Sequence, residues 1–462
     1  MGKRKVELTL KWTSLAFSFV LFLCFLYHSY LRLIYPYDIT SADGFVLGFS
    51  LDLLRGGEIY TDVRETLKAN IYPPLYYLIS SPFLFLTGPS FLPGKLISLF
   101  SSFGIGIVLY FLLKRRVKDK HLPLILSLSF FSFYYTFFWS TLPRPDMLGL
   151  LFSLLGLYAF KEKKNCWLAS FFFTLSFFTK QNYVSAPLAV LIYLFLVGRR
   201  RQFLTFLTTL ALSFSSLFSL FLLVFGPEFF QNVFLYASSY SMRFRHNLFY
   251  TFLSSTLPLL FLFFDSFSSK DLFSIYAATS LVFMSFFLFN PGSASNYFLE
   301  PLCALLLAVT GSPLLKKRSS PLFLLLLFQL LLAPGGGVLD LPWNDVVYLN
   351  SFYQNMKADE KIMELVSTKK AMPECAGYLI FSGKEPSPDI WKLYTLKERM
   401  NLEESIRDYC SSFDYLVSFY DLKRLPECLE NFRLVDKIQK RNFSSIRYGE
   451  ADYFYVEIYE KR

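Results

Sequence analysis

Up to about residue 338, the chain is a series of long apolar runs separated by short clusters of Lys and Arg. Runs of about 15 to 22 apolar residues are close to the length that an α-helix needs to cross a bilayer. The composition agrees, because 54% of the residues are hydrophobic, only 18% are charged and the mean hydropathy is +0.40. We therefore predict a polytopic α-helical membrane protein. The eleven expected spans are 12–34, 93–113, 122–142, 147–160, 166–179, 183–198, 203–225, 248–264, 272–289, 298–314 and 320–337.

The basic residues predict the orientation of these spans. With a cytoplasmic N-terminus, the inner loops hold 19 Lys and Arg residues and the opposite side holds nine. Cytoplasmic loops are enriched in basic residues, so this arrangement is favoured. The protein is then expected in the plasma membrane with its C-terminal region outside the cytoplasm. The net charge of +11 indicates contact with anionic lipid headgroups and calls for no nucleic-acid partner.

The first outer loop, residues 35–92, concentrates carboxylates beside the membrane. It holds six of the 14 acids that precede the C-terminal region: Asp38, Asp43, Asp52, Glu58, Asp62 and Glu65. Residues 44–54 have a helical pattern. The apolar run 73–86 is short for a full crossing and contains Pro82, so we predict an interfacial or re-entrant helix at the outer surface there.

From residue 339 the composition changes to that of a small α/β domain. Residues 340–462 carry 18 basic and 21 acidic side chains. Helices are expected at 355–367 and 402–409, and strands at 377–382, 413–420 and 453–460. Cys375, Cys410 and Cys428 allow one disulfide with three possible pairings. The predicted division is a membrane domain at 1–338 and an extracytoplasmic domain at 339–462.

A carboxylate beside a bilayer can accept a proton from a hydroxyl or amine, or hold a divalent cation that neutralises a phosphate leaving group. Transfer of a sugar from a lipid-linked phosphate needs both tasks near the headgroups. Asp43 is best placed, since it follows the first span closely and precedes a helical stretch. The alternative is that Asp43 or Ser41 only caps that helix.

Several motifs on the outer side occur in an order that resembles a known family. They are Asp43-Gly44, Leu53-Leu54-Arg55-Gly56-Gly57 with Tyr60 and Asp62, Tyr72-Pro73-Pro74-Leu75-Tyr76, Arg144-Pro145-Asp146, Thr179-Lys180-Gln181 and the run from Gly292 to Glu300. Over residues 10–310 they resemble the GT-C glycosyltransferases, most closely the bacterial family 39 proteins related to protein O-mannosyltransferases and lipid A aminoarabinose transferases. The chain departs from the family at Gly44, where many relatives have an acid, and at Tyr72, where the aminoarabinose transferases have Lys.

The resemblance implies a GT-C fold and an inverting transfer of a sugar from a polyprenyl-phosphate donor to an envelope acceptor at the outer leaflet. It implies catalytic roles for Asp43, which could also bind a divalent cation, and for Asp146. The acceptor could be a lipid, a protein or a polysaccharide. The candidates for binding the donor and its phosphate are Lys180, Tyr72, Tyr76, Arg243 and Arg245. The candidates for binding the acceptor or sugar are Asp62, Asn296, Tyr297 and Glu300.

Each candidate also has a structural interpretation. Arg144 and Asp146 could form a local ion pair, and Lys180 could extend to the membrane surface. The basic pair at 243 and 245 could contact lipid headgroups, and Asn296 or Glu300 could cap a helix. Two other functions stay open, namely a flippase for lipid-linked saccharides and a polysaccharide polymerase or ligase. The chain has neither an evident internal repeat nor arginines concentrated in late outer loops, and both features would favour those functions.

Overall fold

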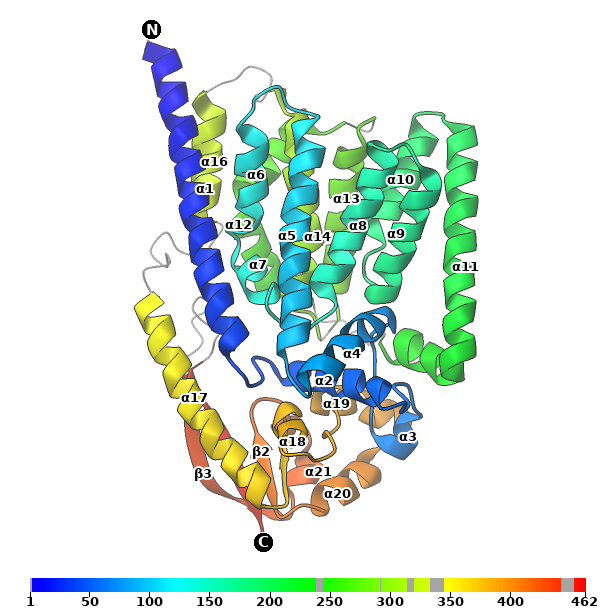
Figure 1. The fold of residues 1–462 in the computed structure, drawn as a ribbon, viewed down its shortest axis with the longest axis vertical. Helices are drawn as coiled ribbons and strands as arrows, with labels where there is room; N and C mark the ends of the chain where they lie inside the picture. Colours follow the sequence, from blue (N-terminus) through cyan, green and yellow to red (C-terminus); the bar gives the residue numbers. More distant parts are fainter. Residues whose placement is uncertain are drawn as a thin grey trace.

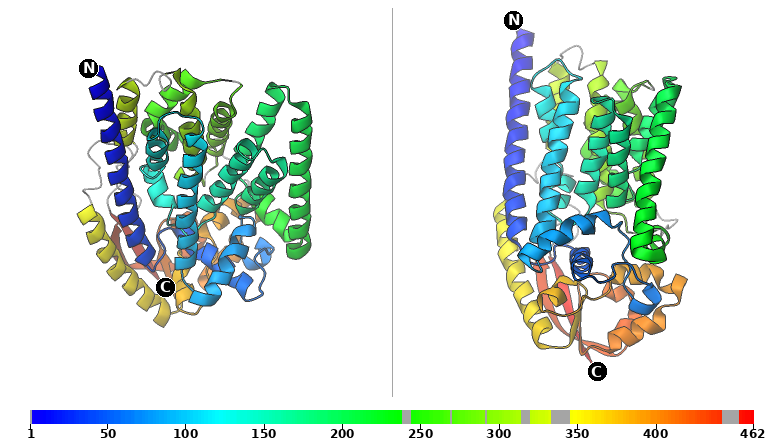
Figure 2. Two further views of the ribbon diagram at one scale, coloured as in Figure 1. Left: turned by 45° about the horizontal axis from the view of Figure 1, so that its top comes forward. Right: turned by 45° about the vertical axis from the view of Figure 1, so that its right-hand side comes forward.

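The structure is a computed structural model that describes residues 2–237, 244–268, 270–290, 292–313, 320–332, 345–441 and 453–462. A bundle of roughly parallel helices stands on a small α/β domain, and three short helices lie between the two (Figures 1 and 2). The N-terminus lies at the far end of the bundle. The first outer loop and the C-terminal domain therefore share the opposite end, while the assignment of the membrane sides stays a prediction.

The bundle contains helices at or near the expected spans. They are α1 (Gly2–Ile34), α5 (Leu92–Lys114), α6 (Leu122–Phe130), α7 (Tyr134–Trp139), α8 (Asp146–Lys161), α9 (Cys166–Thr179), α10 (Ser185–Leu196), α11 (Arg200–Phe230), α12 (His246–Ser266), α13 (Leu272–Phe287), α14 (Leu299–Ala308) and α16 (Ser320–Leu332). Within the described ranges, four stretches are long and apolar enough to cross a membrane, namely Lys5–Ile34, Leu92–Lys114, Arg200–Tyr236 and His246–Ser266. The remaining bundle helices are shorter.

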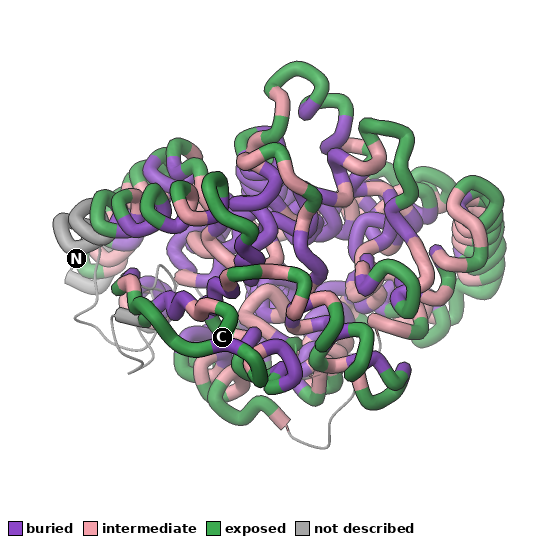
Figure 3. Tube along the Cα trace, turned by 90° about the horizontal axis from the view of Figure 1, so that it is seen from below, coloured by how far each residue is buried: buried purple, intermediate pink, exposed green. Residues whose placement is uncertain are grey.

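Apolar side chains cover both the inside and the outside of this bundle. Leu150, Leu154 and Leu157 of α8 are fully buried in the main core. Leu223 on α11 is 84% exposed, as expected for a side chain that faces lipid. Seen from below, exposed segments lie mainly along the rim and buried ones fill the centre (Figure 3).

The expected span at 122–142 is wrong in one respect, because the structure has two helices there. Phe133 is extended (φ −79°, ψ 133°) and separates α6 from α7. The Ser132 hydroxyl donates to the carbonyl of Ser129 at 2.6 Å, a local bond that competes with helix continuation. Phe131 and Phe133 are buried, so this irregular backbone is surrounded by protein, where it is tolerated at membrane depth.

The first outer loop forms α2 (Ser41–Leu54), α3 (Val63–Thr66) and α4 (Leu75–Thr87) across the lower end of the bundle (Figure 1). The helices at the predicted ranges 44–54 and 73–86 are thus both present. On α4, the side chains of Phe85 and Leu86 are each 78% exposed. This apolar exposure is typical of a helix lying in the membrane interface.

The C-terminal domain combines a four-stranded sheet with short helices. Its elements are α17 (Asp345–Thr368), β1 (Ala371–Pro373), α18 (Gly377–Phe381), α19 (Ile390–Met400), α20 (Glu403–Ser411), β2 (Tyr415–Ser418), η5 (Leu422–Arg424), α21 (Pro426–Leu429), β3 (Phe432–Arg441) and β4 (Tyr453–Lys461). The strand order is β1-β2-β4-β3, with β1 and β2 parallel and the other pairs antiparallel. The predicted boundary at 338 and 339 lies outside the described residues.

Two expectations for this domain can be compared directly with the structure. The strand expected at 377–382 is wrong, because Gly377–Phe381 form α18 and Ser382 caps its C-terminal end. A short apolar run such as Tyr378 to Phe381 fits a buried helix turn as well as a strand. Among the three pairings considered, the disulfide joins Cys410 to Cys428, and Cys375 remains a buried thiol.

The C-terminal domain packs tightly against the start of the first outer loop. Asp359 of α17 is fully buried, pairs with Lys440 of β3 and accepts hydrogen bonds from the phenols of Tyr35 and Tyr378. Tyr35 directly follows α1. The Asp359 cluster, defined as these four residues, therefore connects the membrane bundle to the C-terminal domain through one buried carboxylate.

Beside this cluster, two backbone segments approach each other closely. Gly44 of α2 and Gly377 of α18 approach so closely that a Cβ on Gly44 would overlap the Gly377 nitrogen. The carboxylate of Asp38 lies between them, and burial raises its pKa well above the usual range, with the charge of Asp43 adding to the effect. Only glycine fits at these two positions, so they define the joint between loop and domain.

Candidate functional site

Asp43 lies in the first turn of α2 and has all its acceptor positions engaged. Its Oδ2 accepts the backbone N–H groups of Ile39 (3.1 Å) and Thr40 (2.9 Å). Its Oδ1 accepts the Thr40 hydroxyl (2.6 Å) and the Arg144 Nε–H (3.2 Å). Asp43 therefore caps α2 and also binds a charged residue 101 positions later. Its side chain is only 1% exposed.

Asp146 forms a second buried ion pair. It lies at the start of α8, and its Oδ1 accepts hydrogen bonds from Lys180 Nζ and from Asn296 Nδ2 (2.8 Å). Asp146 and Lys180 are 1% and 5% exposed. The interpretation that Arg144 and Asp146 form a local ion pair is therefore wrong, because each residue binds a partner from elsewhere in the chain. The interpretation that Lys180 extends to the membrane surface is also wrong, because its ammonium group is buried within the protein and paired with Asp146.

Tyr72 lies next to both ion pairs. Lys180 Nζ is 5.7 Å from the centre of the Tyr72 ring, and the phenol contacts Arg144. Burial raises the pKa of Tyr72 to about 12, although the Arg144 charge opposes this shift. Tyr76 is buried one turn further along, against Gly94 and Pro143. Tyr72, directly before Pro73-Pro74, thus supplies a protonated phenol beside two cationic groups.

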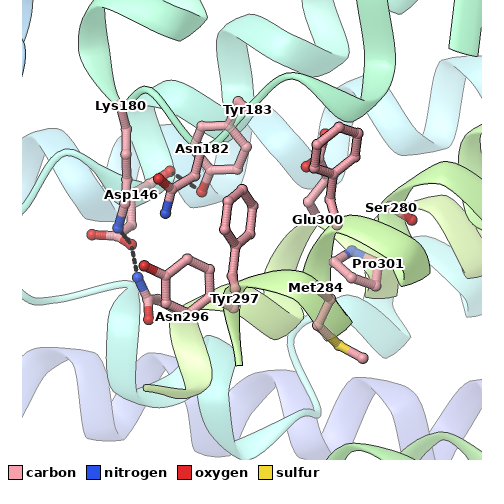
Figure 4. A pocket seen from close by; sticks show the side chains of 12 residues that line it. Asp146, Lys180, Asn182, Tyr183, Ser280, Met284, Asn296, Tyr297, Glu300 and Pro301 are labelled. Atoms are coloured by element: carbon pink, nitrogen blue, oxygen red, sulfur yellow. Dashed lines mark hydrogen bonds and ion pairs between the residues drawn. The ribbon is translucent and has the colours of Figure 1, made fainter. Parts of the chain in front are cut away.

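A cavity of about 20 Å³ opens beside the Asp146 ion pair. This volume is enough for about one water molecule. Figure 4 shows Asp146, Lys180 and Asn296 pointing toward one another at one end, with Tyr297 and Glu300 lining the rest. The Oδ2 of Asp146 and the Oδ1 of Asn296 are buried and have no hydrogen-bond partner among the described residues. A buried acceptor without a donor is costly, so this end of the cavity favours a ligand that donates hydrogen bonds.

Glu300 lines the same cavity from α14, and both of its carboxylate oxygens accept hydrogen bonds. It accepts hydrogen bonds from the hydroxyls of Ser185 (3.0 Å) and Tyr276 (3.3 Å). Glu300 is therefore more than a helix cap, since its partners come from α10 and α13. Tyr297 lies with its ring centre 5.8 Å from Lys180 Nζ.

The structure does not bring every candidate to this site. Asp62 caps α3 through the N–H of Arg64 at 2.8 Å and is absent from the cavity lining. Arg245 is exposed just before α12 and does not line the cavity either. Arg243 lies outside the described residues.

Sequence reasoning missed several residues around the cavity. The hydroxyl of Tyr183 donates to the backbone carbonyl of Asp146 at 2.7 Å, and Asn182 also lines the cavity. Both directly follow the Thr179-Lys180-Gln181 motif, so extending that motif by two residues would have found them. Outside the cavity lining, a buried lysine was also missed: the ammonium of Lys95 donates to the carbonyl of Arg32 at 2.9 Å. Its position inside an apolar span was the available signal.

The suggestion that Asp43 binds a divalent cation can be compared with its surroundings. Four donors already occupy its two oxygens, and the guanidinium of Arg144 lies beside them. Across the described residues, no group of three or more His, Cys, Asp or Glu side chains is arranged to hold a metal ion. The residues present therefore do not fit a cation at Asp43.

The helical bundle, the interfacial helices and the mixed C-terminal sheet together define the fold of the GT-C-type membrane glycosyltransferases. The chain resembles the crystal structure of apo ArnT from Cupriavidus metallidurans, with a TM-score of 0.58 over 95% of this chain and 97% of that chain, at 13% identity. It also resembles the structure of that ArnT bound to undecaprenyl phosphate, with a TM-score of 0.50 over 88% of this chain and 73% of that chain, again at 13% identity. The predicted fold class is confirmed.

Comparison of sequences adds little to this. No known family profile matches the chain. An uncharacterised protein of Aquifex aeolicus (strain VF5) is 30% identical over 209 residues, which are 44% of this chain and 49% of that protein. The chain thus matches about half the length of this curated relative.

Proposed function

We propose that the protein is a membrane glycosyltransferase that moves a sugar from a polyprenyl-phosphate donor to an envelope acceptor at the outer leaflet, inverting the anomeric centre. One observation carries this proposal. Asp146 lines the cavity, uses one oxygen to hold Lys180 and Asn296, and has its other oxygen buried with no hydrogen-bond partner among the described residues. A carboxylate arranged in this way is ready to accept a proton or a sugar hydroxyl.

Lys180 and Arg144 are the groups proposed to bind the donor phosphate. As the bond between the sugar and the phosphate breaks, negative charge grows on the leaving oxygen, and buried cations stabilise it. The Tyr72 phenol lies beside both cations and remains protonated at neutral pH, so it can donate a further hydrogen bond. Burial makes each of these contacts stronger than it would be in water.

Asp146 and Asn296 are proposed to contact the sugar and the attacking group. The free oxygen of Asp146 would take the proton from the acceptor nucleophile, and the free amide oxygen of Asn296 would accept a sugar hydroxyl. Glu300 and Tyr297 would line the opposite wall of the sugar site.

Asp43 is proposed to act as a positioning residue. Its two oxygens accept four hydrogen bonds, so neither oxygen is open to the acceptor substrate. Through Oδ1 it fixes the guanidinium of Arg144, so its effect on the reaction passes through that arginine. Precise placement of a charged group is worth a large part of a catalytic barrier.

The exposed apolar face of α4 supports a lipid-linked donor. Phe85 and Leu86 extend from the loop that also supplies Tyr72 and Tyr76. A polyprenyl tail held in the bilayer beside α4 would leave only its headgroup to be oriented. This anchoring removes much of the entropic cost of bringing the donor to the site.

The test is transfer from a radiolabelled polyprenyl-phosphate sugar by the purified protein. We expect Asp146→Asn to abolish transfer while donor binding persists, and Lys180→Ala to weaken donor use more than acceptor use. We expect Asp43→Asn to lower turnover strongly. Asp119→Asn is the matched control, because this carboxylate also pairs with a lysine, Lys11 at 2.6 Å, at the opposite end of the bundle. Near-normal turnover by Asp146→Asn, or movement of unchanged donor across the membrane, would contradict the proposal.

A further inference from the structure

Helix α19 of the C-terminal domain carries two aromatic side chains that lie outside the hydrophobic core of the domain. Ile390, Leu393 and Leu396 fill the domain core. Trp391 and Tyr394 do not belong to that core, and their spacing of three residues places them on the same side of the helix. Their ring centres are 5.7 Å apart, and Tyr394 is 37% exposed. α19 lies just beneath the lower end of the bundle (Figure 1).

A guanidinium group completes this surface. Arg424 lies over both rings, with its Cζ 5.0 Å from the Trp391 ring centre and 5.6 Å from that of Tyr394. Its Nε–H donates to Asp421 at 2.8 Å, which holds the guanidinium in place, and the side chain is still 49% exposed. We call Trp391, Tyr394 and Arg424 the α19 platform. The platform joins two aromatic rings to a fixed cation that remains open to solvent.

The platform is continuous with the candidate site. A Cβ on Gly292 would lie 3.1 Å from the indole nitrogen of Trp391, so the tryptophan packs against the loop just before η2 (Ser295–Phe298). Asn296 in η2 donates to Asp146. A continuous stretch of five residues, 292–296, therefore spans from the platform to the ion pair at the cavity.

Two further charged residues, one acidic and one basic, lie near the platform. Asp389 accepts the backbone N–H of Lys392 at the start of α19 and lies within electrostatic reach of Arg144. Arg245, at the start of α12, lies within electrostatic reach of Arg424. The C-terminal domain and the bundle thus meet at the platform with two arginines close together, an arrangement that anions favour.

Such a surface has a specific chemical preference. The flat aromatic faces of Trp and Tyr bind the C–H face of a sugar ring through dispersion contacts. A half-exposed guanidinium with N–H groups to spare binds a phosphate or carboxylate with charge-assisted hydrogen bonds. Tight packing between the domains alone would bury Arg424 and Tyr394, and both are exposed instead.

We propose that the α19 platform binds the saccharide of the acceptor, and that this saccharide carries an anionic substituent. The proposal rests on the proposed glycosyl transfer, for which it adds an acceptor subsite and an acceptor class. A sugar ring lies on Trp391 and Tyr394, and its anionic group binds Arg424. The next unit of the acceptor then reaches along the 292–296 loop toward Asp146.

The experiment measures binding of α-glucose 1-phosphate to the full-length protein in detergent, without donor, by saturation-transfer NMR titration. Glucose and inorganic phosphate are the comparison ligands. We expect glucose 1-phosphate to bind at least about tenfold more tightly than either, because only it engages both rings and cation, and tenfold in Kd corresponds to about 1.4 kcal/mol. Equal binding of inorganic phosphate would overturn the proposal, since a bare anion site or lipid-headgroup site would suffice.

Substitutions in the α19 platform test whether glucose 1-phosphate binds there. Arg424→Ala and Tyr394→Ala should each raise the Kd of glucose 1-phosphate at least about fivefold, which is about 1 kcal/mol. Both side chains are exposed, so these variants are expected to fold even where Trp391→Ala does not. Arg407→Ala is the matched control, because Arg407 is 46% exposed and pairs with Glu430 at 3.1 Å in the same domain. An unchanged Kd in Arg424→Ala, or an equal rise in Arg407→Ala, would refute the platform. The Asp146→Asn assay reads donor turnover instead, so failure of one proposal is distinguishable from failure of the other.

Discussion

The buried pair of Asp146 and Lys180 allows a quantitative prediction through a double-mutant cycle. Lys180→Met removes the charge but keeps most of the side-chain volume. It leaves a carboxylate that is 1% exposed with a single described hydrogen bond, from Asn296. Removing one partner of a buried pair typically costs about 3 to 5 kcal/mol in the free energy of unfolding. Asp146→Asn should cost a similar amount, because it leaves the Lys180 ammonium unpaired.

Combining the two substitutions should restore part of the lost stability. The double variant has no unpaired charge, so we expect a cost of about 1 to 2 kcal/mol and a favourable coupling of at least about 2 kcal/mol. The assay is reversible unfolding in mixed micelles by titration with denaturing detergent. Lys180→Met combined with Asp119→Asn is the control, and it should be additive within about 0.5 kcal/mol. Additive costs in the Asp146/Lys180 cycle, or a cost below about 1 kcal/mol for Lys180→Met, would refute the reasoning.

Two further predictions concern the C-terminal domain. Gly377→Ala should destabilise its attachment to the first outer loop by about 1 to 3 kcal/mol, because the new Cβ would overlap the carboxylate of Asp38; faster proteolysis after residue 345 with an intact bundle would be the readout, and unchanged protection would contradict it. Lys423 and Lys437 lower the pKa of Glu457 to about 2 although burial opposes the shift. A depressed carboxyl pKa stabilises the folded state above the unfolded pKa of about 4.5, and this stabilisation is lost as the pH falls through about 2. The full shift is worth about 3 kcal/mol, and screening around two half-exposed lysines reduces it to about 1 kcal/mol. Hydrogen exchange of residues 453–462 should therefore be faster in Glu457→Gln than in the wild type at pH 6 and equal at pH 2.

The fold class could be predicted from the sequence because a bilayer imposes a single dominant rule. Backbone groups in lipid must be bonded internally, so apolar runs and basic clusters are enough to locate most of the helices. The interruption at Phe133 could not be predicted this way, because its buried surroundings come from distant segments. The same limit applies to α18, because its short apolar run fits a helix turn or a strand and its surroundings, such as Gly44, come from a distant segment.

The candidate site was predictable in its residues but not in its pairings. Asp43, Arg144, Asp146 and Lys180 all stand out as charges beside apolar spans. Proximity in sequence suggested Arg144 with Asp146, whereas the structure pairs each with a residue 34 or 101 positions away. Pairing depends on how α2, α8 and α9 converge in space, and local sequence does not carry that information.

The Asp359 cluster has a consequence for how the two parts of this protein can change. Detaching the tail would break the hydrogen bond from the Tyr35 phenol to the Asp359 carboxylate and would remove the support behind Tyr35, eight residues before Asp43. The geometry of the first outer loop is thus determined by residues more than 300 positions further along the chain. Chimeras that exchange the tail between relatives should keep a working loop only when Tyr35, Asp359 and Lys440 are inherited from one parent.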